Sequence, residues 1–137
     1  MNVNPYLSFE GRCDEAIEFY KNALGAEVTR LMRWKDMPNS CPEDGPRPGT
    51  EDKVMHAALR IGDTVVFVSD GRCAGQPKFE GVSLSLAVSS DAKAAERFNA
   101  LANGGTVIMP LGKTFFASSF GMATDRFGVT WMVVVES

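Results

Sequence analysis

The stretch PYLSFEGRCDEAIEFYKNALGAEV, residues 5–28, decides how the rest of the chain is interpreted. Its apolar start, 6–9, predicts a short strand. Residues 14–24 repeat apolar side chains three and four positions apart, which is typical of an amphipathic helix with one buried face. Gly25 ends this helix, because glycine is the usual residue just past a helix end. The alternating residues 27–35 then predict a second strand.

The second half of the chain repeats this order. A shift of 79 positions superimposes six identical pairs: Leu7 on Leu86, Ala16 on Ala95, Phe19 on Phe98, Ala23 on Ala102, Gly25 on Gly104 and Val28 on Val107. Near the ends of the halves the shift is 66, and four pairs match: Arg60 on Arg126, Gly62 on Gly128, Thr64 on Thr130 and Val68 on Val134. One insertion in the first half accounts for both shifts.

The remaining elements complete two similar modules. In the first half, strands 54–61 and 64–69 flank the turn Gly62-Asp63. The second half contains a helix capped by Ser90 or Asp91. Its predicted strands are 82–89, 106–109, 119–124 and 130–135. We therefore expect one α+β domain of two βαβββ modules: module one at 1–70, a linker at 71–81 and module two at 82–137.

The insertion is the segment 37–53, which is rich in proline and glycine. Proline has no backbone N–H to donate, so this segment is not a central strand. It is either a lid over a binding site or a disordered loop.

Composition and charge exclude several classes of protein. The formal net charge of −3 argues against nucleic-acid binding, which needs a basic face. There is no apolar run of membrane-spanning length and no signal-peptide pattern at the N-terminus. The three cysteines, Cys13, Cys41 and Cys73, are odd in number and form no CxxC pair, which indicates free thiols in the reducing cytoplasm.

Three strings resemble the PhnB-like branch of the vicinal oxygen chelate superfamily, whose fold is that of glyoxalase I, bleomycin-resistance proteins and ring-cleaving dioxygenases. They are NPYLSFEGRCDEAIEFYKNALGAE, HAALRIGDTVVFVSD and FGMATDRFGVTWMVVV. The resemblance covers essentially the whole chain. It implies a curled mixed sheet around a cleft, and it implies a homodimer, since superfamily members commonly dimerise.

The resemblance also marks where metal-using members hold their ion, on the first and last strand of each module. Here those positions are Pro5, Val66 or Phe67, Ser83 and Met132. A divalent cation needs carboxylate, imidazole or thiolate donors, and none of these residues supplies one. We therefore expect no metal site and no cofactor.

The same resemblance implies which residues line the cleft. Its ligand position on the first strand faces the cleft, so Pro5, Leu7 and Phe9 are expected there, facing Ser83 and Ser85 of the second module. The predicted cleft residues are completed by His56, Phe67, Phe116, Ser119 and Met132. Apolar walls facing hydroxyl groups suit a small organic ligand of mixed polarity.

Several candidates have a second interpretation. His56, the only histidine, is either a general base or ligand-orienting donor, or a hydrogen-bonded strand residue without a catalytic part. Arg60 and Arg126 either clamp an anion or pair with a nearby carboxylate such as Asp63 or Asp125. The cluster Phe115, Phe116 and Phe120 is either a cofactor platform or ordinary packing.

These observations predict a cytoplasmic, metal-free glyoxalase-fold protein that binds a small organic molecule in its cleft. The alternative is a lyase or isomerase that uses His56 or a relocated divalent metal site, and a third possibility is an interaction dimer with a filled cleft. No GxGxxG, P-loop, GxSxG or HExxH motif is present. Some members of the branch are labelled methyltransferases, but no glycine-rich loop for a nucleotide-like cofactor supports that activity here.

Overall fold

The computed structural model describes residues 1–36, 49–71, 73 and 76–136. Contacts divide the chain into two compact units, unit 1 at Met1–Pro77 and unit 2 at Lys78–Ser137, and the division falls inside the predicted linker. Most of the predicted proline-rich loop, with Cys41, lies outside the described residues.

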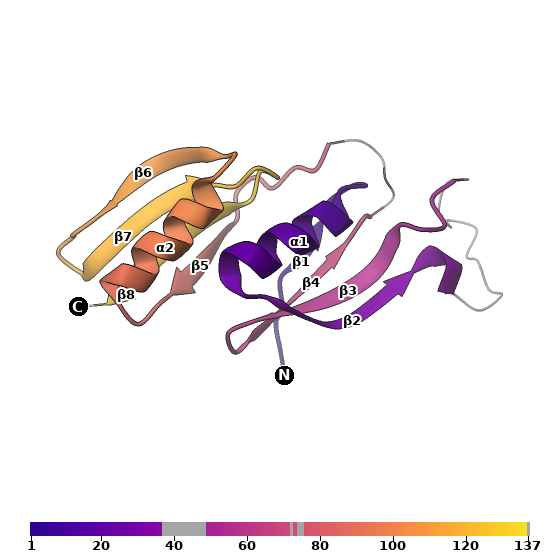
Figure 1. The fold of residues 1–137 in the computed structure, drawn as a ribbon, viewed down its shortest axis with the longest axis horizontal. Helices are drawn as coiled ribbons and strands as arrows, with labels where there is room; N and C mark the ends of the chain where they lie inside the picture. The colour runs from indigo at the N-terminus through magenta and orange to yellow at the C-terminus, as the bar shows by residue number, and fades with distance from the viewer. Residues whose placement is uncertain (37–48, 72, 74–75, 137) are drawn as a thin grey trace. The chain divides into compact units, whose positions relative to one another are not determined.

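Unit 1 is a four-stranded mixed sheet in the order β1-β4-β3-β2. Its strands are β1 (Tyr6–Ser8), β2 (Glu27–Arg33), β3 (Val54–Ile61) and β4 (Thr64–Ser69). A short 3-10 helix, η1 (Trp34–Asp36), follows β2. β1 runs parallel to β4, and the other pairings are antiparallel. The helix α1 (Cys13–Leu24) lies against one face of this sheet (Figure 1).

The core of unit 1 lies between α1 and the sheet. The helix buries one stripe of side chains: Cys13, Ala16, Ile17, Tyr20, Ala23 and Leu24. Leu59 and Val68, fully buried, come from the central strands β3 and β4. Gly25 ends the helix in the left-handed conformation, with φ 66°, as the sequence predicts.

Unit 2 has the same order of elements and a second mixed sheet, β5-β8-β7-β6. Its strands are β5 (Ser83–Ala87), β6 (Thr106–Gly112), β7 (Ala117–Thr124) and β8 (Thr130–Glu136). The helix α2 (Asp91–Ala102) covers one face, and the Ser90 hydroxyl caps it by accepting a hydrogen bond from the Lys93 N–H at 3.1 Å. β6 runs on through Pro110, beyond the predicted strand, because it is an edge strand and an edge tolerates the missing donor.

The two hairpins differ, although the sequence shift of 66 aligns them. In unit 1 the turn is Gly62-Asp63 and Arg60 lies inside β3. In unit 2 a longer loop follows Thr124, and the buried Asp125 organises it. The Asp125 carboxylate accepts hydrogen bonds from Phe127 N at 2.9 Å, Val129 N at 3.1 Å and Trp131 Nε1 at 3.0 Å. The predicted equivalence of Arg60 and Arg126 is therefore wrong, because only the first belongs to a strand.

The α+β class and the twofold strand–helix–three-strand order are confirmed, with two separate four-stranded sheets. No helix in the described part of the chain is long and apolar enough to cross a membrane.

Candidate ligand-binding site

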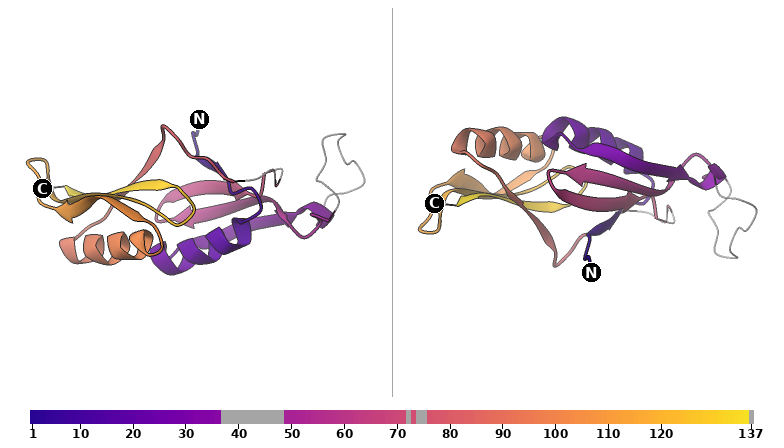
Figure 2. Two further views of the ribbon diagram at one scale, coloured as in Figure 1. Left: turned by 90° about the horizontal axis from the view of Figure 1, so that it is seen from above. Right: turned by 90° about the horizontal axis from the view of Figure 1, so that it is seen from below.

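The unit 1 sheet has one face covered by α1 and an opposite face on which the described residues of that unit place no helix, here called the open face (Figure 2). Strand β1 shows the alternation between them, since Tyr6 is 53% exposed and Leu7 is 7% exposed. Phe9 is completely buried. The prediction that Leu7 and Phe9 line an open cleft is wrong, because both side chains belong to the core of unit 1.

Three rings meet on the open face: Tyr6 from β1, Phe67 from β4 and His56 from β3. The Tyr6 hydroxyl lies 3.0 Å from His56 Nδ1. Ring centroids are 5.5 Å apart for Tyr6 and His56, 6.0 Å for Tyr6 and Phe67, and 5.1 Å for His56 and Phe67. These tilted contacts make a continuous aromatic surface, here called the aromatic cluster.

Strand register explains why the rings come together. Tyr6 is paired with Phe67 across the parallel β1–β4 ladder, and Phe67 is paired with Ala58 across the antiparallel β3–β4 ladder. Side chains of directly paired residues project from the same face, and residues two apart on a strand share that face. His56 therefore lies beside Phe67. The hairpin ambiguity between Val66 and Phe67 is also resolved, since Val66 is buried.

His56 is held from one side only. Its Nδ1 is engaged by Tyr6, and within the described residues its Nε2 has no hydrogen-bond partner. A histidine oriented through one ring nitrogen presents the other to a ligand as a donor or an acceptor, depending on its tautomer. This pairing with Tyr6 is the partner that sequence inspection did not find.

The same face continues onto the edge strand β2. Met32 is paired with His56, and Arg30 is paired with Ala58 after a bulge. Arg30 is exposed and has no ion-pair partner within the described part of the chain. Arg30, a cation without an ionic partner in the described ranges, thus lies across Ala58 from Phe67 of the aromatic cluster.

Unit 2 carries its own group of predicted residues on the face opposite α2. Ser83, Ser85 and Met132 project from this face, because Ser85 is paired with Met132 and Ser83 with Thr130. Phe116 is 46% exposed and meets Phe120 edge to face at 5.2 Å. Their contact with a ligand stays a prediction.

Ser119 does not belong to that group. It is 7% exposed, and its hydroxyl donates a hydrogen bond to Asp91 Oδ1 at the start of α2, at 2.6 Å. The prediction that Ser119 lines the ligand cleft is therefore wrong, because its hydroxyl links β7 to the helix.

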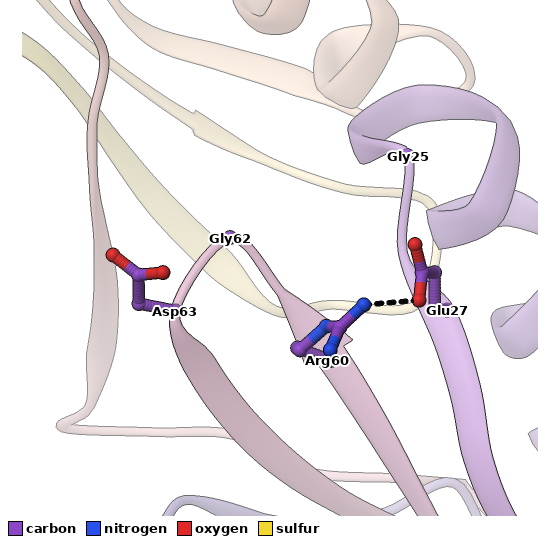
Figure 3. A pocket seen from close by; sticks show the side chains of 5 residues that line it. All are labelled: Gly25, Glu27, Arg60, Gly62 and Asp63. Atoms are coloured by element: carbon purple, nitrogen blue, oxygen red, sulfur yellow. Dashed lines mark hydrogen bonds and ion pairs between the residues drawn. The ribbon is translucent and has the colours of Figure 1, made fainter.

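A polar hollow of about 400 Å³ lies at the other end of the unit 1 sheet. It is lined by Gly25, Glu27, Arg60, Gly62 and Asp63. Arg60 forms an ion pair with Glu27, while Asp63 lies on the other side of the Gly62 turn (Figure 3). Arg60 pairs with a carboxylate as predicted, although the partner is Glu27 rather than Asp63. The Arg126 guanidinium donates to the Asn103 carbonyl.

The positions that the superfamily resemblance marks for a metal do not fit one. The Pro5 carbonyl already accepts the Phe67 N–H at 2.9 Å, and Ser83, Phe67 and Met132 supply no carboxylate or imidazole. Within the described residues, no group of three or more His, Cys, Asp or Glu side chains is placed to hold a metal ion. Cys13 is also unsuited to bind a metal, because burial, with Asp70 nearby, raises the pKa of its thiol.

Tyr6 is the main residue of this face that sequence analysis missed. The signal was present in the first strand, where Tyr6 and Ser8 alternate with the more apolar Leu7 and Phe9. The apolar members of an alternating strand point to the core. In β1 the alternation of apolar and polar residues gives the correct face, whereas the superfamily's ligand position gives the wrong one.

Comparison with known proteins shows which family this chain resembles. Residues 1–134 match the model of the family described as 3-demethylubiquinone-9 3-methyltransferase. Protein YjdN from Escherichia coli (strain K12) is 35% identical over 142 residues, covering 98% of this chain and 95% of that protein.

Solved structures agree. Protein PA1353 from Pseudomonas aeruginosa has a TM-score of 0.85 at 43% identity, with 99% of this chain and 98% of that one covered. A putative 3-demethylubiquinone-9 3-methyltransferase, PhnB protein, from Bacillus cereus has a TM-score of 0.80 at 26% identity, with 98% and 99% covered. A glyoxylase/bleomycin resistance protein/dioxygenase domain from Frankia sp. EAN1pec shares the fold, with a TM-score of 0.65 at 15% identity and 99% and 95% covered.

Proposed function

Since the chain belongs to the 3-demethylubiquinone-9 3-methyltransferase family, the PhnB-like branch of the vicinal oxygen chelate superfamily, we propose that it binds a small organic molecule on the open face of unit 1, without a metal ion. The observation that carries the proposal is the aromatic cluster of Tyr6, His56 and Phe67 on that face.

Exposure and polarity support a ligand here. Tyr6 is more than half exposed, and His56 and Phe67 are only partly buried, so apolar ring surface faces outward. Covering such surface is favourable by roughly 25 cal/mol per Å². The Tyr6 hydroxyl and His56 Nε2, which has no hydrogen-bond partner within the described residues, add polar groups that orient a ligand.

A thermal-shift screen of metabolites and drugs tests the proposal, followed by titration of each hit into Phe67→Leu and His56→Ala. We expect hits whose affinity falls at least about tenfold in Phe67→Leu, because the ring contact is lost. Lys113→Ala, an exposed residue of the other unit outside every predicted cleft position, is the control. Hits that bind both cluster variants as well as the unchanged protein would contradict the proposal.

The second candidate function is a metal-free lyase or isomerase that uses His56 as general base. It is favoured by one observation, the Tyr6 hydroxyl at 3.0 Å from Nδ1, which fixes the ring; Nε2 accepts a substrate proton in the tautomer whose Nδ1–H donates to Tyr6. If His56→Ala keeps binding of a hit but abolishes its turnover, the protein is an enzyme.

Elemental analysis with and without added Mg, Mn, Ni and Zn tests the metal-dependent alternative.

Methyl transfer is not part of the proposal. The connections from β1 to α1 and from β5 to α2 lack the glycine-rich turn that cradles a nucleotide-like cofactor.

The cytoplasm remains the proposed setting, and free thiols at Cys13 and Cys73 accord with it.

A homodimer remains the proposed assembly. It is supported by apolar side chains exposed along edge strand β6, namely Val107, Ile108 and Met109, which are 45–55% exposed. Sedimentation of Ile108→Lys beside the unchanged protein tests it, and an unchanged dimer would remove β6 from the interface.

A further inference from the structure

The geometry points to the class of molecule that the open face of unit 1 takes: a planar aromatic carboxylate, with its ring on Phe67 and its anionic group at Arg30. This inference rests on the proposed function and adds the identity of the ligand's two ends. Neither the family's description nor the resemblance assigns a role to Arg30.

The first step is the row of side chains across the sheet. Arg30, Ala58, Phe67 and Tyr6 occupy successive strands β2, β3, β4 and β1 in direct register. Paired residues share a face, so all four side chains project from the open face. Neighbouring strands lie about 4.8 Å apart, which places the Cα atoms of Arg30 and Phe67 about 10 Å from one another.

The row contains one side chain much smaller than the others, that of Ala58. Ala58 carries only a methyl group, and it is 6% exposed between its larger neighbours. We infer that a flat ring placed across Ala58 lies against Phe67, whose own ring contacts those of Tyr6 and His56. A puckered ring of the same size makes poorer contact with such a surface, because flat faces stack closely.

The charged side chains of the open face determine which ligand group can bind beside the ring. Arg60 projects from the same face, but Glu27 neutralises it. At the far end of β1, Glu10 accepts a hydrogen bond from Ser8 at 3.1 Å. Arg30 has no ionic partner within the described residues, so it is the cation on this row available to a ligand. Arginine binds a carboxylate through two parallel hydrogen bonds, which selects a planar anion over a neutral isostere.

Three probes separate these requirements: benzoate, benzamide, which has the ring without the charge, and cyclohexanecarboxylate, which has the charge without the flat ring. Their dissociation constants are measured by following backbone amide shifts of the ¹⁵N-labelled full chain. We expect benzoate to bind at least about tenfold more tightly than either other probe. The largest shifts should fall on β3 and β4, around Ala58 and Phe67.

Two charge variants complete the test. Arg30→Gln should weaken benzoate about tenfold and leave benzamide within about twofold, since only the anion loses a partner. Lys21→Gln is the matched control, because Lys21 is an exposed cation on α1, against the opposite face, where it pairs with Glu18. Arg30 is exposed and has no ion-pair partner among the residues that the structure describes, so its replacement should leave thermal stability unchanged.

The inference is overturned if benzamide binds as tightly as benzoate, if both charge variants weaken benzoate equally, or if no probe shifts β3 and β4 at millimolar concentration. The proposed function fails in a different way. Benzamide binding that disappears in Phe67→Leu keeps the site and rejects only the anionic class, whereas probes that shift other surfaces alone reject the site itself.

Discussion

Asp70, which follows β4, accepts a hydrogen bond at Oδ1 from the backbone N–H of Cys13 at 2.7 Å, and so ties the start of α1 to the sheet. Its Oδ2 accepts the Val54 N–H, also at 2.7 Å. No side chain of the residue before α1 caps this helix. One fully buried carboxylate therefore satisfies a helix N-terminus and the start of β3, elements far apart in sequence.

Asp70→Ala is predicted to destabilise the protein by about 2–5 kcal/mol, because two buried N–H groups lose their acceptor. Asp70→Asn should cost less, since its amide oxygen still accepts one of these bonds. Chemical denaturation measures both, with the exposed Glu18→Ala as the control, expected within about 0.5 kcal/mol of the unchanged protein. Equal effects of Asn and Ala would contradict the assigned pair of hydrogen bonds.

In unit 2 the corresponding link uses Asp91, whose Oδ1 accepts hydrogen bonds from Ser119 at 2.6 Å and Ser118 at 2.7 Å. These bonds, with that of Ser119 the larger cause, lower the pKa of the Asp91 carboxyl. A carboxyl whose pKa is lower in the folded state stabilises the fold above its unfolded pKa. The contribution disappears as the pH falls through the folded pKa.

Ser119→Ala is therefore predicted to raise the pKa of Asp91 towards its ordinary value and to flatten the acid end of the stability profile. A carboxyl-detected NMR titration measures the first effect and denaturation below pH 5 the second. Ser83→Ala, an exposed serine on β5, should change neither. An unmoved Asp91 titration in Ser119→Ala would show that the hydrogen bond does not set it.

Cys13 is predicted to resist alkylation in the native protein at pH 8. Burial, with Asp70 adding to it, raises the pKa of this thiol, and the reactive thiolate is scarce. Iodoacetamide labelling with peptide mass mapping should modify the partly exposed Cys73 first and Cys13 only after addition of denaturant. Native labelling of Cys13 at the rate of Cys73 would contradict the burial.

Strand and helix positions followed from the sequence because periodicity reports burial directly. The phase of the repeat was harder to predict. A shift of 79 aligns Phe19 with Phe98, whereas the buried residues Ala16 and Tyr20 of α1 correspond to Ala94 and Phe98 of α2, a shift of 78. Sequence identity therefore paired Phe19 with Phe98, whereas the α1 residue that faces the sheet at the position of Phe98 is Tyr20.

Which side chains project from the open face was also harder to predict than where its strands lie. The alternation of Tyr6 and Ser8 with Leu7 and Phe9 indicated the buried side of β1, but the superfamily's ligand position placed Leu7 and Phe9 on the other face. Cross-strand partners such as Arg30 and Ala58 depend on a bulge in β2. Bulges change register without a sequence signal that one chain alone reveals.

Two glycines of unit 2, the buried Gly121 on β7 and the exposed Gly112 on β6, form a matched pair. A Cβ on Gly121 would lie 2.9 Å from both Leu111 Cα and Phe98 Cε2, whereas a Cβ on Gly112 meets nothing within 4 Å. Gly121→Ala is predicted to destabilise the protein by about 1–3 kcal/mol through overpacking. Gly112→Ala should be nearly neutral, and thermal denaturation compares the two. Equal behaviour would mean that β6 and α2 pack less closely on β7 than the structure shows.

The Tyr6–His56 hydrogen bond makes a prediction that needs no ligand. If the Tyr6 hydroxyl is the donor to Nδ1, the proton of the neutral imidazole resides on Nε2. We expect ¹⁵N spectra of the side chain to show Nε2 protonated in the unchanged protein. Tyr6→Phe keeps the ring but removes the donor, so the population of the other tautomer should rise. Phe67→Leu, which leaves the hydroxyl in place, should keep the original tautomer. A majority of protonated Nδ1 in the unchanged protein would reverse the direction of the bond and leave Nε2 as an acceptor, the form that a general base requires.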